Sequence, residues 1–189
     1  MSRTYKIAVL VGSLRKESLN AKMAKALEAA APDSLAFEQV SFGDLPLYDE
    51  DAEKDVPAAW TAFRDRIRPA EAVLFVTPEY NRSVPGGLKN AIDVGSRPYG
   101  RSVWAKKPAG VVTVSPGGIG GFGANHHLRQ SLVFLDMPVM QQPEAYFGGA
   151  GGFFDEDGEL ANEGTAKVVR QFITAFALWV ERLAGGAPS

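Results

Sequence analysis

The 189-residue sequence contains no cysteine, and no apolar run in it approaches the length of a membrane-spanning helix. Without thiols the chain cannot form disulfides, thiolate zinc sites or cysteine-ligated iron–sulfur clusters, and it has no cysteine nucleophile. A run of about 20 apolar residues is needed to cross a bilayer, so we expect no membrane partner. The lack of cysteine suits a reducing compartment, and we expect a cytoplasmic protein.

An excess of charge of one sign is also absent. The chain carries 20 basic and 22 acidic residues, which gives a formal net charge of −2. Proteins that neutralise nucleic-acid phosphates need a basic surface, so we expect no nucleic-acid partner. The length and the 46% hydrophobic content are those of an ordinary globular protein. We predict a single domain over residues 1–189.

Patterns that bind metals are equally scarce. The two histidines, His126 and His127, are adjacent, so on a helix their side chains diverge by about 100° and cannot chelate one ion together. A helix surface or a subunit interface is the better interpretation of this pair. The acidic segment 155–159 lacks the ligand and glycine spacing of an EF-hand loop and indicates a solvated turn. We therefore expect no metal site.

Short apolar segments alternate with segments of helical character along the chain. The expected strands span residues 5–11, 35–41, 71–77, 109–115 and 137–141. The expected helices span residues 18–31, 57–68, 86–95, 121–135 and 165–183. The strand segments include continuous apolar runs, as in strands buried on both faces. The alternation predicts an α/β fold: a flavodoxin-like, doubly wound, five-stranded parallel sheet of order 2-1-3-4-5 with helices on both faces.

Three unusual loops follow the first, third and fourth expected strands. They are residues 12–20, 78–87 and 115–121, called here the first, second and third loops. In a sheet of order 2-1-3-4-5 these three strands are neighbours, and ligands bind outside their carboxyl ends where the strand order reverses. The three loops are therefore expected to meet at one edge of the sheet.

The first loop has the residues of an anion site. Ser13 and Ser18 supply hydroxyls, Asn20 supplies an amide, and Arg15 supplies a planar fork that matches phosphate. The amides and the dipole at the start of the next helix favour an anion at the same place. The loop matches neither a Walker A motif nor Gly-x-Gly-x-x-Gly, which argues against ATP and against a Rossmann dinucleotide. The alternatives are a helix cap at Ser18 and a solvated charge at Arg15.

The second and third loops suit a flat ring. Pro78 and Pro85 stiffen the second loop, while Gly86 and Gly87 let a ligand approach its backbone. The alternative for this loop is a plain turn capped by Asn81, with Tyr80 packed on the core. The third loop is rich in glycine, and its amides suit an anion or the edge of a ring. The alternative here is a flexible turn.

Two motifs in these loops resemble the NADPH-dependent FMN reductase family, with the chromate- and quinone-reducing bacterial members most similar. The first motif is Gly12-Ser13-Leu14-Arg15-Lys16-x-Ser18-x-Asn20. The second is Pro78-Glu79-Tyr80-Asn81-x-Ser83-Val84-Pro85-Gly86-x-Leu88-Lys89-Asn90-Ala91-Ile92-Asp93. The resemblance extends from the first strand to about Gly148, and the two motifs in this order and spacing are highly specific.

The resemblance implies FMN as bound cofactor and NADPH or NADH as hydride donor. The residues it assigns to the FMN phosphate are Ser13, Arg15, Ser18, Leu19 and Asn20. Those that line the isoalloxazine ring are Glu79, Tyr80, Asn81, Arg82 and Ser83, and those at its far edge are Ser115, Gly117 and Gly118. The resemblance also implies a homodimer, which can pair into a tetramer, with the flavin near the subunit boundary.

The implied activity is ping-pong hydride transfer from NAD(P)H through flavin N5 to a small-molecule acceptor: a quinone, a free flavin, chromate or an azo compound. The cofactor carries this chemistry, so we assign no catalytic side chain. The alternative is a flavodoxin-type electron carrier without NAD(P)H activity. Many relatives carry an aromatic residue at position 82, and we hypothesise that Arg82 changes the acceptor preference or binds a nucleotide phosphate.

Overall fold

The computed structural model describes residues 3–184, and its centre is a parallel sheet of order β2-β1-β3-β4-β5. The strands are β1 (Tyr5–Val11), β2 (Leu35–Gln39), β3 (Ala72–Thr77), β4 (Ala109–Val114) and β5 (Ala145–Phe147). The predicted flavodoxin-like topology is confirmed. Strands β3 and β4 are buried along their whole length, which explains why their sequences are continuously apolar instead of alternating.

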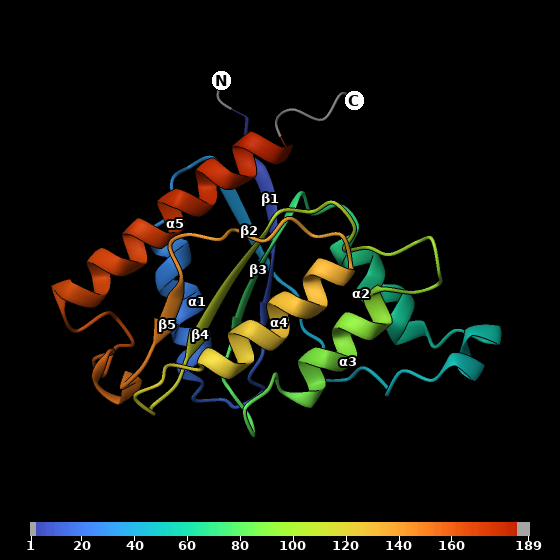
Figure 1. The fold of residues 1–189 in the computed structure, drawn as a ribbon, viewed down its shortest axis with the longest axis horizontal. Helices are drawn as coiled ribbons and strands as arrows, with labels where there is room; N and C mark the ends of the chain where they lie inside the picture. The colour runs from blue at the N-terminus through green and yellow to red at the C-terminus, as the bar shows by residue number, and fades with distance from the viewer. Residues whose placement is uncertain (1–2, 185–189) are drawn as a thin grey trace.

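Helices cover both faces of the sheet (Figure 1). They are α1 (Leu19–Ala29), α2 (Ala58–Ile67), α3 (Gly86–Gly95), α4 (Phe122–Phe134) and α5 (Glu163–Ala184), with short 3-10 helices η1 (Glu50–Lys54) and η2 (Ala150–Gly152). Alternate residues of β1 point to opposite faces. Ile7 and Val9 join the core beneath α1 and α5, whereas Ala8 and Leu10 join the core beneath α2, α3 and α4.

The five predicted helices are present, with ends that differ by at most two residues. The prediction of a strand at residues 137–141 is wrong. This segment pairs with the sheet only through the isolated bridge of Val139 to Ala109, and the last strand is β5 instead. Met137, Val139 and Met140 are buried, so the apolar run reflects burial and not a ladder of strand hydrogen bonds. Pro143 has no N–H to donate, and regular pairing begins only after it, at Ala145.

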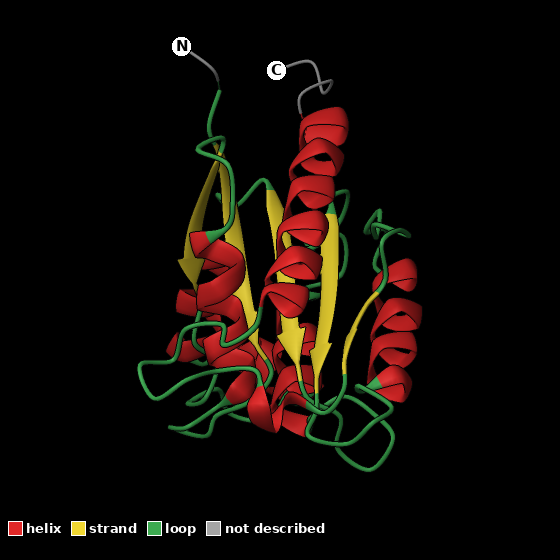
Figure 2. Ribbon diagram, turned by 90° about the vertical axis from the view of Figure 1, so that its left-hand side faces the viewer, coloured by secondary structure: helices red, strands yellow, loops and turns green. Residues whose placement is uncertain are grey.

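The carboxyl ends of the strands lie at one edge of the sheet, and the long loops gather there (Figure 2). Val11 pairs with Val76 near the ends of β1 and β3, and Thr77 pairs with Thr113 near the ends of β3 and β4. The first, second and third loops therefore leave the sheet side by side. This carboxyl edge carries the candidate site.

Candidate active site at the carboxyl edge

The first loop leaves β1 in direct contact with the end of β3. The Gly12 amide donates to the Val76 carbonyl at 2.8 Å. A Cβ at Gly12 would lie 2.1 Å from Thr77 Oγ1 and 3.1 Å from the Thr77 Cα. Only glycine fits at this position, and the absence of a side chain brings the first loop against the start of the second loop.

Ser18 and Asn20 are buried at the start of α1. Ser18 Oγ accepts from the Ala21 amide at 3.2 Å, so the predicted alternative of a helix cap is present. A hydroxyl that accepts in this way still has its proton to donate. Asn20 Nδ2 donates to the Val114 carbonyl at 3.4 Å, while Asn20 Oδ1 is buried without a partner among the described residues. The start of α1 thus offers two groups to a ligand, the hydroxyl proton of Ser18 and the Oδ1 atom of Asn20.

Around this helix start the backbone is rich in free donors. Within residues 3–184, the amides of Ser13, Leu14 and Lys16 donate to no protein acceptor. The Leu19 amide belongs to the first helical turn, which has no intrahelical partners, and the Leu19 side chain packs against the core. Exposed Arg15 lies in the same loop. Free amides, a helix N-terminus and a guanidinium together favour a phosphate.

Two hollows flank the first loop. One, of about 330 Å³, is lined by residues of the first and second loops, among them Arg15, Tyr80 and Gly86. The other, of about 280 Å³, is lined by Ser13, Arg15 and residues near the end of β2. Arg15 lies in both, so this predicted phosphate residue adjoins the space beside Tyr80.

The second loop contains a tight turn at residues 79–83, called here the 79–83 turn. The Tyr80 amide donates to the Ser83 carbonyl at 2.9 Å, and the Ser83 amide donates to the Tyr80 carbonyl at 3.0 Å. Asn81 and Arg82, at the tip, both have positive φ values of 51° and 65°. This is the backbone pattern of a type I′ turn, and it is costly for a residue such as arginine. The turn leaves Tyr80 about half exposed.

Helix α4 contacts the 79–83 turn at two points. Glu79 Oε2 accepts from the Ala124 amide in the first turn of α4 at 3.0 Å, and Glu79 Oε1 lies 3.4 Å from Arg82 Nη1. Ser83 Oγ is hydrogen-bonded to His127 Nδ1 at 2.9 Å. The turn residues lie at the edge of the sheet where the sequence predicted them. Their two partners in α4 were not predicted, because Ala124 is 45 residues from Glu79 and His127 is 44 residues from Ser83.

The third loop has the close backbone packing that its glycines suggest. Ser115 Oγ accepts from the Gly117 amide at 3.1 Å, and the Gly117 carbonyl accepts from Gly149 beyond β5. A Cβ at Gly148 would lie 2.5 Å from the Gly118 carbonyl oxygen. Gly117 and Gly118 are exposed at the edge. The loop leads directly into α4, so α4 joins the second and third loops.

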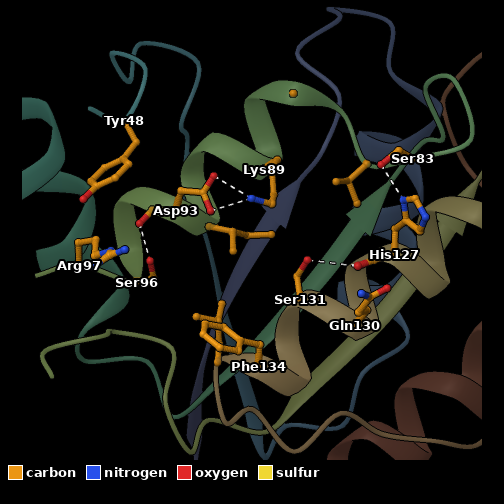
Figure 3. Close-up of a pocket in the computed structure, with 14 residues that line it drawn as sticks. Tyr48, Ser83, Lys89, Asp93, Ser96, Arg97, His127, Gln130, Ser131 and Phe134 are labelled. Atoms are coloured by element: carbon orange, nitrogen blue, oxygen red, sulfur yellow. Dashed lines mark hydrogen bonds and ion pairs between the residues drawn. The ribbon is translucent and has the colours of Figure 1, made fainter. Parts of the chain in front are cut away.

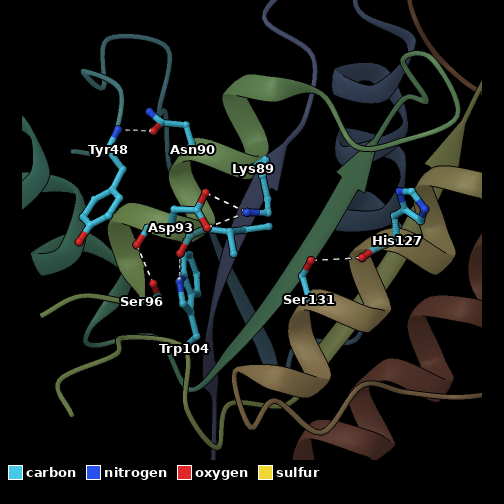
Figure 4. Close-up of polar contacts among 9 residues, drawn as sticks. Tyr48, Lys89, Asn90, Asp93, Ser96, Trp104, His127 and Ser131 are labelled. Carbon is cyan, nitrogen blue, oxygen red and sulfur yellow. Dashed lines mark hydrogen bonds and ion pairs between the residues drawn. The ribbon is translucent and has the colours of Figure 1, made fainter. Parts of the chain in front are cut away.

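A cavity of about 840 Å³ lies between α3 and α4 (Figure 3). Ser83 and His127 line it at one end, and Tyr48 and Phe134 lie at the other. Asn90 Oδ1 accepts from the Tyr48 amide at 2.8 Å and so fixes the segment before η1 (Figure 4). Burial raises the pKa of Tyr48. No pattern in the sequence predicts this cavity.

In residues 3–184, no group of three or more His, Asp or Glu side chains is placed to hold a metal ion. None of the described helices is long and apolar enough to cross a membrane.

The sequence matches the NADPH-dependent FMN reductase family over residues 5–152. This chain belongs to that family. It is 63% identical over 182 residues to a quinone reductase of Pseudomonas putida, covering 96% of this chain and 97% of the relative. It is 45% identical to a 2-hydroxy-1,4-benzoquinone reductase of a Burkholderia species, covering 93% and 96% of the two chains. The solved structure of FerB, a flavoenzyme NAD(P)H:(acceptor) oxidoreductase from Paracoccus denitrificans, superposes with a TM-score of 0.90 at 43% identity, over 95% of this chain and 99% of FerB.

Family membership makes the chain an NAD(P)H-dependent oxidoreductase with FMN as cofactor. It also rules against the flavodoxin-type carrier considered as an alternative. The carboxyl edge fits FMN: free amides and Arg15 suit the phosphate, and the hollow between Arg15 and Tyr80 leads toward the 79–83 turn. The buried, unpartnered Asn20 Oδ1 requires a donor, which a ribityl hydroxyl can supply.

Proposed function

We propose that this enzyme reduces quinones with electrons from NAD(P)H, by a ping-pong sequence in which donor and acceptor occupy the same place in turn. The observation that carries this proposal is the placement of the phosphate-type first loop and the 79–83 turn around one hollow at the carboxyl edge. The relatives that are named quinone reductases support the acceptor class. Free flavins, chromate and azo compounds are secondary acceptors in this proposal.

We assign the predicted residues as follows. The phosphate side consists of Ser13, Arg15, Ser18, Asn20 and the backbone amide of Leu19. The ring side consists of the 79–83 turn, with Glu79, Tyr80, Asn81, Arg82 and Ser83, and of the third loop, with Ser115, Gly117 and Gly118. The free amides, the buried polar atoms and the exposed turn described above support these assignments.

Bound FMN supplies two-electron chemistry, so the protein groups only need to bind, orient and stabilise charge. Arg15 and the start of α1 offset the phosphate charge. With FMN bound, amides of the turn and of the third loop would be donors to the ring and would stabilise negative charge on it. No side chain is assigned as a general acid or base.

Anaerobic mixing with NADPH or NADH tests the function. Bleaching of the flavin absorption within seconds, followed by recovery when a benzoquinone is added, is the expected result. Parallel lines in double-reciprocal plots of rate against both substrates would support the ping-pong order. Flavin that stays oxidised in the presence of either nucleotide would contradict the proposal.

We also propose that the single domain of residues 1–189 forms a homodimer, which can pair into a tetramer, in the cytoplasm. Phe134 is 88% exposed and borders the 840 Å³ cavity between α3 and α4. A two-fold axis here would let each copy insert an apolar side chain into the groove of the other, as self-complementary interfaces do. The variant Phe134→Asp should sediment as a monomer, whereas Leu178→Asp, at another exposed apolar residue, should keep the wild-type mass.

A further inference from the structure

The two adjacent histidines of α4 contact two different parts of the carboxyl edge. His126 Nε2 lies 3.2 Å from the hydroxyl of Tyr146 in β5, whose pKa is raised to about 12 by burial and by Glu144. His127 Nδ1 lies 2.9 Å from Ser83 Oγ in the second loop. The divergence of the two side chains on the helix therefore separates their roles. Only His127 contacts a residue proposed to line the flavin ring.

The 79–83 turn needs external support because its backbone is strained. Asn81 tolerates a positive φ, but Arg82 at φ 65° is held in a conformation that costs about 1–2 kcal/mol for an L residue. Such conformations persist only where surrounding contacts determine them. The exposed pair of Arg82 with Glu79 contributes little, since the arginine is 73% exposed.

Helix α4 supplies the missing support at both ends of the turn. The Ala124 amide donates to Glu79 at the entry, and His127 is hydrogen-bonded to Ser83 at the exit. The first contact uses the backbone amide of Ala124 in the first turn of α4, and the second uses the side chain of His127 one turn later. The turn packs closely on α4 at Gly123, where an added Cβ would lie 2.8 Å from the Arg82 carbonyl oxygen.

We propose that His127 is a positioning residue that holds the 79–83 turn in the conformation that faces the flavin ring. It acts through its hydrogen bond to Ser83. This inference rests on the proposed function, which places the turn against the ring. Loss of the His127–Ser83 hydrogen bond would let the turn relax toward negative φ, and its amides would no longer point at the ring.

The first measurement leaves the flavin out. In the FMN-free protein, hydrogen exchange at the Tyr80 and Ser83 amides should be about fivefold faster in His127→Ala than in wild type, which corresponds to one lost hydrogen bond. His127→Asn should restore slow exchange, because an asparagine amide can occupy the place of Nδ1. His126→Ala is the matched control and should leave both amides unchanged. Equal exchange in wild type and His127→Ala would overturn the proposal.

The second measurement uses the FMN-loaded enzyme. His127→Ala should lower the flavin reduction potential and change its visible spectrum, because donors that stabilise the reduced ring are displaced. Ser83→Ala should give a similar change, and the double variant should be no worse than either single variant, as expected for two partners in one interaction. If exchange quickens while potential and spectrum stay at wild-type values, the turn does not face the ring, and both this inference and the ring-side assignment fail. The reaction with NAD(P)H and quinone is tested separately by flavin bleaching.

Discussion

The first loop and the 79–83 turn lie at the same edge of the sheet but are held in different ways. The polar groups of the first loop come from one short segment, in which Ser18 caps the helix that begins at the next residue, although Gly12 also packs against Thr77 of β3. The 79–83 turn is fixed by α4, more than 40 residues away in the sequence. The donors of an anion site can thus come from one short segment, whereas the turn proposed to face the flat ring is strained and depends on a distant helix for support.

The largest effect is expected where the first and second loops touch. Gly12→Ala should lower the free energy of unfolding by about 3 kcal/mol, because the new Cβ collides with the Thr77 backbone as well as its side chain. Chemical denaturation measures this change. Gly151→Ala is the control, since a Cβ there meets nothing within 4 Å. Equal stability of the two variants would show that the two loops do not share a tight contact.

Arg15 tests the phosphate side alone. Arg15→Ala should raise the FMN dissociation constant about 30-fold, the loss expected for a hydrogen bond to a charged group. The stability of the FMN-free protein should not change, because the Arg15 side chain is exposed. Lys25→Ala removes an exposed cation from α1 and should bind FMN as wild type does. Full flavin retention by Arg15→Ala after dialysis would contradict the assignment.

Ser18 separates the two interpretations of the first loop. Ser18→Ala should cost about 1 kcal/mol of stability through the lost helix cap. Ser18→Asp keeps a capping oxygen but places a negative charge beside the phosphate, so FMN binding should fall while the stability of the FMN-free protein is retained. Unchanged FMN affinity in Ser18→Asp would leave Ser18 as a cap only. Thermal unfolding without FMN and fluorescence titration with FMN make the two measurements.

The same contrast explains what the sequence predicts well. Periodicity and cap residues are local, so β1, α1 and the first loop follow from neighbouring residues. Strand order follows from the alternation of strands and helices. The prediction of a strand at 137–141 was wrong because an apolar run indicates only that its side chains are buried. Here the side chains are buried, but the segment is joined to the sheet only by one isolated bridge. The partners of Glu79 and Ser83 could not be predicted, because no local pattern records which residues of α4 face the turn.

The smallest expected effect separates charge from backbone strain in the 79–83 turn. Arg82→Gly should raise the free energy of unfolding by about 0.5 kcal/mol, because glycine adopts positive φ without the steric cost that arginine bears. Asn81→Gly is the matched control with a smaller gain, since asparagine already tolerates this region.

If Arg82 binds a nucleotide phosphate, Arg82→Gly and Arg82→Ala should both raise the KM for NADPH, and Arg82→Lys should not. Unchanged Michaelis constants for nucleotide and quinone in Arg82→Ala would show that the charge of Arg82 has no part in binding either substrate. A less stable Arg82→Gly would show that the turn is not strained.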